Sequence, residues 1–522
     1  MPTFIPTNYH QDLLLAINLE EQLQQGTFEF ALHYLIEHKL DLSVFYPRYK
    51  NDEQGRPAYD PRVLLKIVLF AYSRGITSSR EIDWCCRNNI IFKALACNHE
   101  PHFTTIAHFI SSKPSDIEAI FEQVLLVCDQ QGLLGHELFA IDGCKMASDA
   151  AKTHSGTFKE LGEKRDKIKR LIKHHMSEHA RCDQHDDEGA AKAQRHQQTI
   201  DTLNKQHDKI VNFLDNNTPR IGSGKTQREV KSNITDNESA KMTTSKGTIQ
   251  GFNSVTSADK KRQVIIDAQV VGSGQEHQVL QPVLNAIKAR YQRLGFSQNL
   301  YQDGIIVTAD TGYANEDNMQ YLHDNAINAY IPDNQFRSRD PKFSDQKQKY
   351  GKRHQDKKST APKRFTQADF LFDPKRLTCY CPEGQRMHIN SQSQDKHGNE
   401  KVFFEGPMSQ CRVCDKKHHC MQNPSSADTR DGHGRQVSFI IKKNNRTLNY
   451  TDWMKQRVDS DQGKHIYSHR MSVIEPVFAN ITSNKGLKRF SLRGKAKVQG
   501  QWQLYCLVHN IEKLNNYGHL GR

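Results

Sequence analysis

Residues 1 to about 135 have the hydrophobic periodicity of several short helices. Between Leu64 and Tyr72, apolar side chains recur at spacings of three and four residues, which places them on one helical face. Three helix starts are marked by capping residues: Asp60 followed by Pro61, Ser78 with Glu81 at capping-box spacing, and Thr104 or Thr105. Short helices joined by tight turns suit a helix-turn-helix-like DNA-binding domain, and they describe a small helical bundle equally well.

The middle of the chain alternates between apolar runs with strand character and stretches with helical periodicity. The predicted strands are residues 138–142, 251–258, 264–271, 305–310 and 328–332. The predicted helices are residues 276–294 and 314–326, and a much later helix carries Glu475. Because the second and third strands are separated only by DKKRQ, we expect them to form a hairpin. This order of elements predicts an α/β fold with a mixed sheet.

A long polar segment, residues 158–215, separates the first of these strands from the rest. Its apolar positions recur at spacings of three and four: Ile200, Leu203, His207, Ile210 and Leu214. Residues 182–189, CDQHDDEG, suit a reversal between two helices. We therefore expect an inserted helical hairpin. Its thin apolar seam is compatible with a solvated insertion and also with a dimerisation coiled coil.

Composition and charge narrow the class of partner. The 522 residues are enough for two to four structural units, and Lys plus Arg exceed Asp plus Glu by 14. Nucleic acid is the leading partner, because we find no basic amphipathic helix at the N-terminus and no lipidation signal that would indicate a membrane surface. No apolar run has transmembrane length, and no signal peptide is visible. We expect a cytoplasmic, nucleoid-associated protein with reduced cysteines.

Three acidic residues have the placement expected of metal ligands. Asp142 and Asp310 each end an apolar run with strand character, which brings a carboxylate to the edge of a sheet, and Glu475 lies in the later helix. Three converging carboxylates suit two Mg²⁺ ions, for which Mn²⁺ could substitute, because these cations prefer hard oxygen ligands. Two such ions about 4 Å apart can activate an attacking oxygen and stabilise a leaving oxygen in phosphodiester chemistry.

Pro476 follows the third acid directly. Inside a helix a proline removes a backbone donor at a cost of about 3 kcal/mol, so we expect the helix either to kink there or to start near Glu475. A start at this point would separate Glu475 from Tyr467 and Arg470, which would then lie in an earlier turn.

A cysteine cluster lies between the second and third acids. Cys411 and Cys414 have zinc-knuckle spacing, and Cys381 with Cys420 could complete a tetrahedral zinc site. Cys379, His418 and His419 would remain spare. Free cysteines in a small β-rich insertion are the alternative, because one half of the site has CxC spacing. The preceding basic stretch, residues 336–364, is typical of a solvated linker that can also follow a DNA backbone.

Several stretches of the chain resemble the bacterial insertion-sequence transposases of the DDE class. They are GRPAYDPRVLLKIVLFAYSRGITSSREI, EPHFTTIAHF, LFAIDGCKMASDA, ITDNESAKMTTSKGTIQGFN, VTADTGYAN, RMSVIEPVFANI and FSLRGKAKVQGQWQLYCLVHNIEKL. The resemblance implies a ribonuclease H-like catalytic core with inserted segments, preceded by a helical DNA-binding domain. In that core the first acid lies on the first strand, the second follows the fourth strand, and the third lies on a closing helix.

The resemblance also implies roles for individual residues. Asp142, Asp310 and Glu475 would be the metal ligands. Tyr467, Arg470 and either Lys485 or Lys488 would contact DNA from the closing helix and the segment after it. The sequence departs from the commonest family pattern here: the glutamate lies one residue further from the arginine, and the first lysine lies further downstream. Two other departures are Ile110, where relatives often have arginine, and GFNSV in place of GYNVQ.

The expected organisation follows from these elements. Residues 1–135 form a helical DNA-binding domain, and residues 136–335 with 465–522 form the ribonuclease H-like core, which contains the hairpin at 158–215. Residues 336–464 form a basic, cysteine-containing insertion. The expected function is metal-dependent cleavage and strand transfer on double-stranded DNA, with a homodimer holding the terminal inverted repeats and the target DNA. The alternatives are a nuclease without strand transfer and a catalytically silent DNA-binding protein.

Overall fold

The computed structural model describes residues 16–49, 57–112, 114–182, 187–222, 227–343, 364–395, 398–429, 431–442 and 449–520. The chain divides into two compact units. The first comprises Met1–Phe336 and Tyr450–Arg522, and the second comprises Arg337–Asn449. Most of the basic stretch expected to be a linker, residues 344–363, lies outside the described residues. In the part of the chain that the structure describes, no helix is both long and apolar enough to cross a membrane.

The N-terminal part of the first unit is helical, as predicted. Its helices are α1 (Phe28–His38), α2 (Pro61–Ser73), α3 (Ser79–Asn88), α4 (Ile90–Leu95), α5 (Phe103–Ser111) and α6 (Pro114–Gln130). Asp60 is the N-cap residue of α2, and its carboxylate accepts a 2.7 Å hydrogen bond from a backbone N–H of the first turn. Ser78 is the N-cap residue of α3, but its side chain makes no capping hydrogen bond, so the predicted capping box is wrong. α5 begins at Phe103, one residue before the predicted Thr104, because His102 caps it.

A mixed sheet forms the centre of the first unit. Its strands are β1 (Leu138–Ala147), β6 (Ala240–Thr244), β7 (Gly247–Asp259), β8 (Ile265–Val271), β9 (Ile306–Ala309) and β10 (Ala329–Tyr330). Their order is β10-β9-β1-β7-β6, and β8 also pairs with β7. β7 runs antiparallel to β1, β6 and β8, whereas β1, β9 and β10 are parallel. The five predicted strands are confirmed, while β6 was not predicted and β1 continues five residues past Asp142.

Two predicted helices connect the strands. A short 3₁₀ turn, Glu276–Gln278, leads into α9 (Leu280–Arg293), and α10 (Glu316–Asp324) follows β9. Before β6 the chain forms two small two-stranded ladders, in which β2 (Ser155–Gly156) pairs with β5 (Ser232–Asn233) and β3 (Arg220–Ile221) pairs with β4 (Glu229–Val230).

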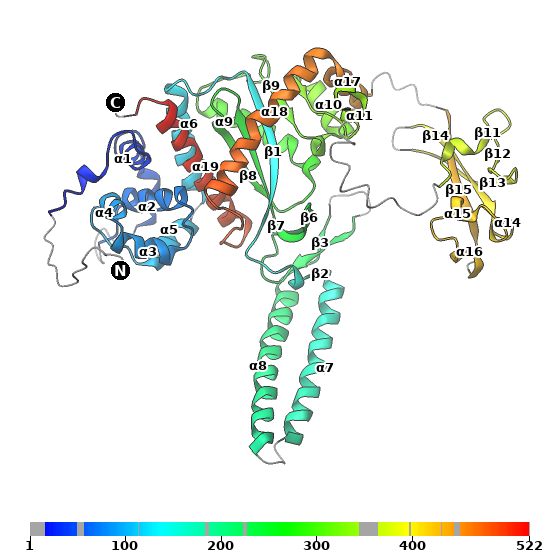
Figure 1. Cartoon of the computed structure of the whole chain (residues 1–522), viewed down its shortest axis with the longest axis horizontal. Helices are drawn as coiled ribbons and strands as arrows, with labels where there is room; N and C mark the ends of the chain where they lie inside the picture. The colour runs from blue at the N-terminus through cyan, green and yellow to red at the C-terminus, as the bar shows by residue number, and fades with distance from the viewer. Residues whose placement is uncertain are drawn as a thin grey trace, which may run out of the picture. The chain divides into compact units, whose positions relative to one another are not determined.

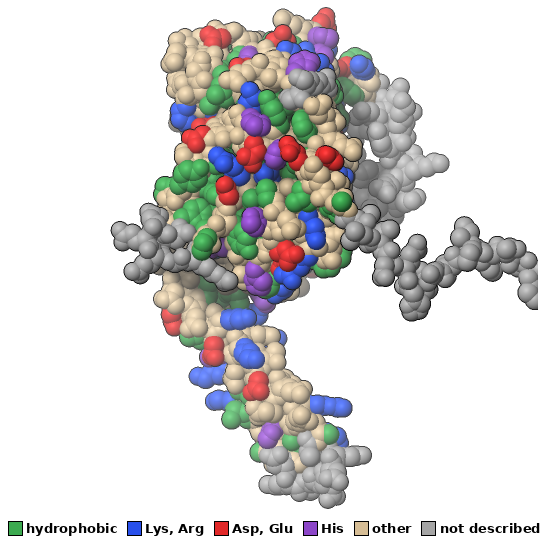
Figure 2. Space-filling model, turned by 90° about the vertical axis from the view of Figure 1, so that its left-hand side faces the viewer, with side chains coloured by type: hydrophobic (Ala, Val, Ile, Leu, Met, Phe, Trp, Pro, Cys, Tyr) green, Lys and Arg blue, Asp and Glu red, His purple; other side chains and the backbone are tan. Residues whose placement is uncertain are grey.

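The predicted helical hairpin consists of α7 (Phe158–Cys182) and α8 (Asp187–Asn216), which run side by side (Figure 1). Of the predicted reversal, residues 183–186 lie outside the described residues. The buried residues of the hairpin are few: Leu161, Ile168, Ile210 and Phe213 form one cluster, and Ala193 and Ile200 are also buried. Lys and Arg side chains recur along its surface in Figure 2. The thin seam predicted for this segment is therefore present, and most of both helices is covered with polar residues.

The C-terminal part of the first unit contains α17 (Tyr450–Asp459), α18 (Asp461–Ala479), a π-helical turn (Asn480–Asn484) and α19 (Lys495–Tyr517). Pro476 lies inside α18, so the prediction of a helix that starts near Glu475 is wrong. The proline has no N–H to bond the carbonyl oxygen of Ser472, four residues earlier. That oxygen instead accepts a 2.9 Å hydrogen bond from the side-chain amide of Gln263. This contact compensates for the missing backbone donor.

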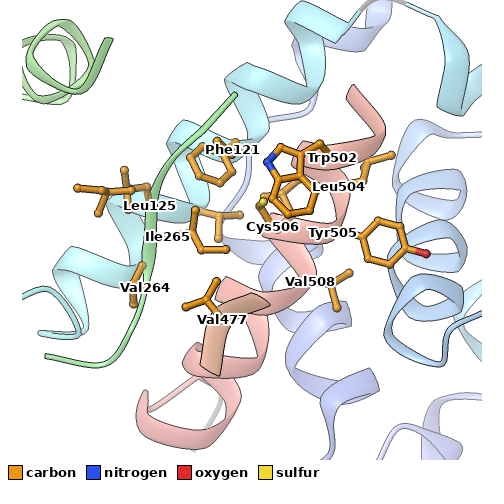
Figure 3. Packing of buried hydrophobic residues seen from close by; sticks show 14 of the residues in the cluster. Phe121, Leu125, Val264, Ile265, Val477, Trp502, Leu504, Tyr505, Cys506 and Val508 are labelled. Carbon is orange, nitrogen blue, oxygen red and sulfur yellow. The ribbon is translucent and has the colours of Figure 1, made fainter. Parts of the chain in front are cut away.

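The core of the first unit is built around α19. Its buried residues, among them Trp502, Leu504, Tyr505, Cys506 and Val508, lie among side chains of α6, β8 and α18 (Figure 3). Two side-chain amides of the same helix bond to the backbone of β8. Asn510 exchanges two 2.8 Å hydrogen bonds with Ile265, and Gln499 bonds Val270 N and Ala268 O at 2.7 Å. β8 pairs with no strand beyond β7 among the described residues, so α19 satisfies backbone groups that an edge strand leaves unpaired.

The second unit is a small antiparallel sheet with short helices. Its strands, in spatial order, are β11 (Leu371–Asp373), β12 (Thr378–Tyr380), β13 (Arg386–Gln394), β14 (Glu400–Pro407) and β15 (His433–Lys442). The helices are α14 (Met408–Arg412), α15 (Lys417–Cys420) and α16 (Ser426–Thr429). Its own core consists of Phe370, Cys379, Met387, Val402, Phe404 and Val437. The predicted β-rich character of this segment is confirmed.

A buried ion-pair cluster ties α9 to the sheet and to α6. The Arg290 guanidinium bonds the carboxylates of Asp267 and Glu118, and it donates a 2.9 Å hydrogen bond to the carbonyl oxygen of Ile266. The side chains of Arg290 and Asp267 are only 4% and 1% exposed. A buried charge that loses its partner is strongly destabilising.

Replacement of Arg290 by leucine should therefore lower the stability of the first unit by about 3–5 kcal/mol, because Asp267 would remain buried without its cation. Arg293→Leu is the matched control: this arginine pairs with Glu122 but is largely exposed, so its loss should cost at most about 1 kcal/mol. Urea unfolding followed by tryptophan fluorescence measures both, since Trp84, Trp453 and Trp502 all lie in the first unit. Equal effects of the two variants would contradict this account.

His509 is a second buried polar group of α19. One ring nitrogen bonds the carbonyl oxygen of Gln263 at 2.8 Å, and the other lies 3.0 Å from the side-chain amide of Asn480. A neutral ring that donates to the first group and accepts from the second satisfies both contacts. Burial lowers the pKa of His509 to about 3. Because the unfolded chain would protonate this ring near pH 6.5, the unfolded state binds more protons between these two pKa values.

The free energy of unfolding should consequently fall as the pH is lowered from about 6.5 toward 3. His509 should contribute up to about 1.4 kcal/mol per pH unit to this fall. His509→Gln should show a shallower loss between pH 6.5 and 5 in urea unfolding, because glutamine does not titrate. Exposed His519, replaced in the same way, should leave the slope unchanged. A His509→Gln variant with the full slope of the unmodified protein would exclude His509 as the cause.

Candidate active site

The pairing of β1 with β9 brings the first two predicted acids together. The two strands are parallel, with Ile141 opposite Ala309. Asp142 and Asp310 are the next residues on the two chains, so they lie side by side at about the 4.8 Å spacing of neighbouring strands. Asp310 follows the last residue of β9, whereas Asp142 lies within β1 and is held by its pairing with Thr256 of β7. The apolar run before Asp310 thus predicted a strand end correctly, whereas Asp142 is the fifth of ten residues in β1 and does not end its strand.

Arg470, on α18, bridges the two aspartates. Its Nη1 donates a 2.8 Å hydrogen bond to Oδ2 of Asp142, and its Nη2 lies 3.4 Å from Oδ1 of Asp310. The arginine side chain is 7% exposed, compared with 20% for Asp142 and 40% for Asp310. α18 crosses the sheet beside β1 (Figure 1). A side chain 328 residues away in the sequence therefore compensates the charge of the acid pair.

The electrostatics of Asp142 reflect this crowded position. Burial raises the pKa of its carboxyl group above the usual value, and the negative charge of Asp310 adds to the rise. The charge of Arg470 and the backbone N–H of Gly143, which donates a 2.8 Å hydrogen bond, act in the opposite direction. Asp142 is thus a carboxylate that depends on nearby positive charge to remain ionised.

Glu475 reaches the same region from α18, five residues after Arg470. It is exposed and lines a cavity of about 480 Å³ together with Asp142. The other charged side chains at this cavity are Lys145 and Glu276. Asp142 and Asp310 therefore share a bonding partner, Arg470, and Asp142 and Glu475 line the same cavity.

Among the described residues, no three His, Cys, Asp or Glu side chains are arranged to hold a metal ion as they stand. The donor chemistry nevertheless fits a divalent cation. Asp142 and Asp310 offer hard carboxylate oxygens on adjacent strands, and Glu475 offers a third group at the adjoining cavity.

The three remaining predicted DNA contacts have different surroundings. Tyr467 lies one turn before Arg470, whose guanidinium is 5.8 Å from its ring centre. Lys485 is buried, and its ammonium group bonds Glu512 of α19. Lys488 is exposed. Of the two alternative lysines, only Lys488 therefore presents its charge to solvent.

Sequence reasoning missed Glu276 and Lys145. Glu276 is the first residue of the 3₁₀ turn that follows β8, and Lys145 lies three residues after Asp142 on β1. An acid shortly after an apolar strand is the signal that identified Asp310, and it could have identified Glu276 as well. The carboxylate lies 3.7 Å from the ammonium group of Lys145.

The second unit gathers the four cysteines predicted to bind zinc. Cys381, Cys411, Cys414 and Cys420 line one small cavity. Cys379 does not, because it is buried in the core of this unit, with its Sγ 3.8 Å from the sulfur of Met387.

Two glycines make room for one of these thiols. A β-carbon at Gly434 would lie 2.5 Å from Sγ of Cys411, and one at Gly406 would lie 3.1 Å from it. Burial raises the pKa of Cys420 to about 11, and the neighbouring thiols Cys411, Cys381 and Cys414 contribute to the rise. The four sulfur atoms therefore share one environment, which is a donor set that suits zinc.

Two protein-family models match parts of the chain. A family model described as a transposase domain (DUF772) matches residues 17–112, which include α1 to α5. A model described as a transposase DDE domain matches residues 380–515, which include the four cysteines, Arg470 and Glu475. No curated protein matches the chain. The two matches, one near each end of the chain, support its assignment to the insertion-sequence transposases of the DDE class.

Proposed function

We propose that the chain cleaves the ends of its own DNA element and joins them to target DNA at the site formed by Asp142, Asp310 and Glu475. The observation that carries this proposal is the pairing of Asp142 with Asp310 on adjacent strands, bridged by Arg470 beside the cavity that Glu475 lines. DNA is the substrate that a transposase family implies. The net charge of +14 suits such a polyanion.

The order of the strands supports a ribonuclease H-like core. Five strands of the sheet lie in the order β8-β7-β1-β9-β10, and only β7 runs against its neighbours. Without the short extra strands, the first acid lies on the first strand of this core and the second acid follows the fourth. The third acid lies on α18, which packs on β1 and β7. This is the placement that the resemblance to DDE transposases implied.

The residues of the site have separable tasks in this chemistry. Asp142, Asp310 and Glu475 would hold Mg²⁺, or Mn²⁺ in its place. Divalent cations bound there would supply activation of the attacking oxygen and stabilisation of the leaving oxygen. Arg470 holds the two aspartate side chains beside each other. It would also supply a fixed positive charge beside the scissile phosphate. Lys488, and Tyr467 beside Arg470, are placed to contact the DNA backbone.

Binding of the element ends is assigned to the N-terminal helices. α3 presents Trp84, an aromatic side chain that is 62% exposed, together with exposed Arg80 and Arg87. An exposed aromatic side chain between two basic residues suits binding to nucleic acid. Two ends must be held together for strand transfer, so we propose that the active form is a homodimer.

Asp142→Asn, Asp310→Asn and Glu475→Gln should each abolish cleavage of DNA that carries the element ends, while end binding in a mobility-shift assay is retained. These changes remove a negative oxygen but keep the size of the side chain. Asp317→Asn, an exposed acid on α10, is the matched control and should cleave normally. Cleavage that survives in Asp310→Ala would refute the assignment.

A strand-transfer assay with precleaved ends separates a transposase from a nuclease that only hydrolyses.

We also propose a structural zinc ion in the second unit, held by Cys381, Cys411, Cys414 and Cys420. The shared cavity, and the glycines that admit Cys411, support this proposal. Because zinc binds thiolates, it would lower the pKa of these cysteines and join β12, α14 and α15 into one folded module.

The purified protein should therefore contain about one zinc ion per chain by elemental analysis. Cys414→Ser and Cys381→Ser should lose most of this zinc, because a three-thiolate site binds it far more weakly. Cys97→Ser, which changes an exposed cysteine of the first unit, should retain it. A protein without stoichiometric zinc, whose stability a strong chelator leaves unchanged, would show that these cysteines are free thiols.

A further inference from the structure

A fourth carboxylate, Glu276, lies next to the proposed catalytic acids. It begins the 3₁₀ turn between β8 and α9, and this turn packs on the turn Thr311–Tyr313 that follows Asp310. The side chain is mostly buried and lines the same cavity as Asp142 and Glu475. Glu276 therefore reaches the cavity from the turn that follows β8, and not from the closing helix α18.

Gly312 creates the space that this carboxylate occupies. A β-carbon at Gly312 would lie 2.0 Å from Oε2 of Glu276, closer than real β-carbons come to another atom, and 3.1 Å from its Cδ. The glycine is the second residue after Asp310. The segment that carries the second acid is thus shaped to admit Glu276, because any larger residue would push the carboxylate away.

Charge contacts hold the same carboxylate toward the site. Lys145 Nζ lies 3.7 Å from Oε1 of Glu276, and both side chains line the cavity. Burial raises the pKa of Glu276, Lys145 opposes the rise, and the charges of Asp142 and Asp310 contribute to it. Glu276 therefore shares the electrostatic environment of the two aspartates.

Tyr313 ends the turn that packs on the turn of Glu276. Its side chain is fully buried, and its hydroxyl has no hydrogen-bond partner within the described part of the chain. Burial raises its pKa, and the charges of Asp142, Glu276 and Asp310 raise it further. An unsatisfied buried hydroxyl costs about 1–3 kcal/mol.

We propose that Glu276 is a fourth metal-binding carboxylate of the active site, admitted by Gly312 and restrained by Lys145. This inference rests on the proposed metal-dependent function.

The formal charges around the cavity are consistent with a fourth metal-binding carboxylate. Four carboxylates, Asp142, Asp310, Glu475 and Glu276, face two cationic side chains, Arg470 and Lys145, which leaves 4 − 2 = 2 negative charges. A residual charge of this size favours a divalent cation over a monovalent one.

Mn²⁺ binding to the full-length protein without DNA, followed by electron paramagnetic resonance, tests the proposal directly. Glu276→Gln should weaken Mn²⁺ binding by about 10–100-fold, whereas Asp317→Asn should leave it unchanged. Lys145→Gln should strengthen binding, because it removes a competing positive charge. A purely structural role of the Lys145–Glu276 pair would shift both variants in the same direction. Mn²⁺ affinity in Glu276→Gln equal to that of the unmodified protein would overturn the proposal.

Asp142→Asn separates this inference from the proposed function. If Asp142→Asn loses Mn²⁺ and Glu276→Gln does not, only the role of Glu276 is refuted. If neither change affects Mn²⁺, the metal site itself is refuted. Should Glu276→Gln fail to fold, Gly312→Ala provides the same test with every charge retained, because its methyl group displaces the Glu276 carboxylate. Gly312→Ala is then expected to weaken Mn²⁺ binding, and an unchanged affinity would overturn the proposal.

Discussion

The first unit depends on the way α19 covers β8. Asn510 and Gln499 satisfy four backbone groups of this strand, and the apolar side of the helix packs on α6, β8 and α2. The stacking of Tyr505 on Tyr72 of α2, with ring centres 4.5 Å apart, extends the contact to the N-terminal helices. Because one helix is buried against both the sheet and the N-terminal helices, these two parts of the chain share a single core.

This shared core fixes the framework on which the proposed catalytic acids lie. The parallel pairing of β1 with β9 places Asp142 beside Asp310, and the paired residues before the two acids form continuous buried runs. α18 then supplies Arg470 to the pair and Glu475 to the adjoining cavity. The geometry of the site is consequently a product of strand register and helix packing, not of a flexible loop.

Sequence patterns predicted what depends on neighbouring residues. Apolar runs identified the strands and the positions of Asp142 and Asp310, and periodicity identified the hairpin of α7 and α8. Patterns could not show that Lys485 is buried against Glu512. The accommodation of Pro476 within α18 was equally hidden, since it depends on Gln263, 209 residues before the carbonyl group that it bonds. In each case the deciding partner lies on another element, and residue spacing along one element does not reveal it.

The neighbours of Glu276 show how the site balances stability against charge. Carboxylates on adjacent strands repel one another, and burial strengthens that repulsion because the local dielectric constant is low. Arg470 offsets it for Asp142 and Asp310, and Lys145 offsets it for Glu276. Since Arg470 and Glu475 lie on the same helix, the packing of α18 that stabilises the aspartate pair also brings the third acid to the cavity. Loss of that packing would therefore remove charge compensation and the proposed catalytic geometry together.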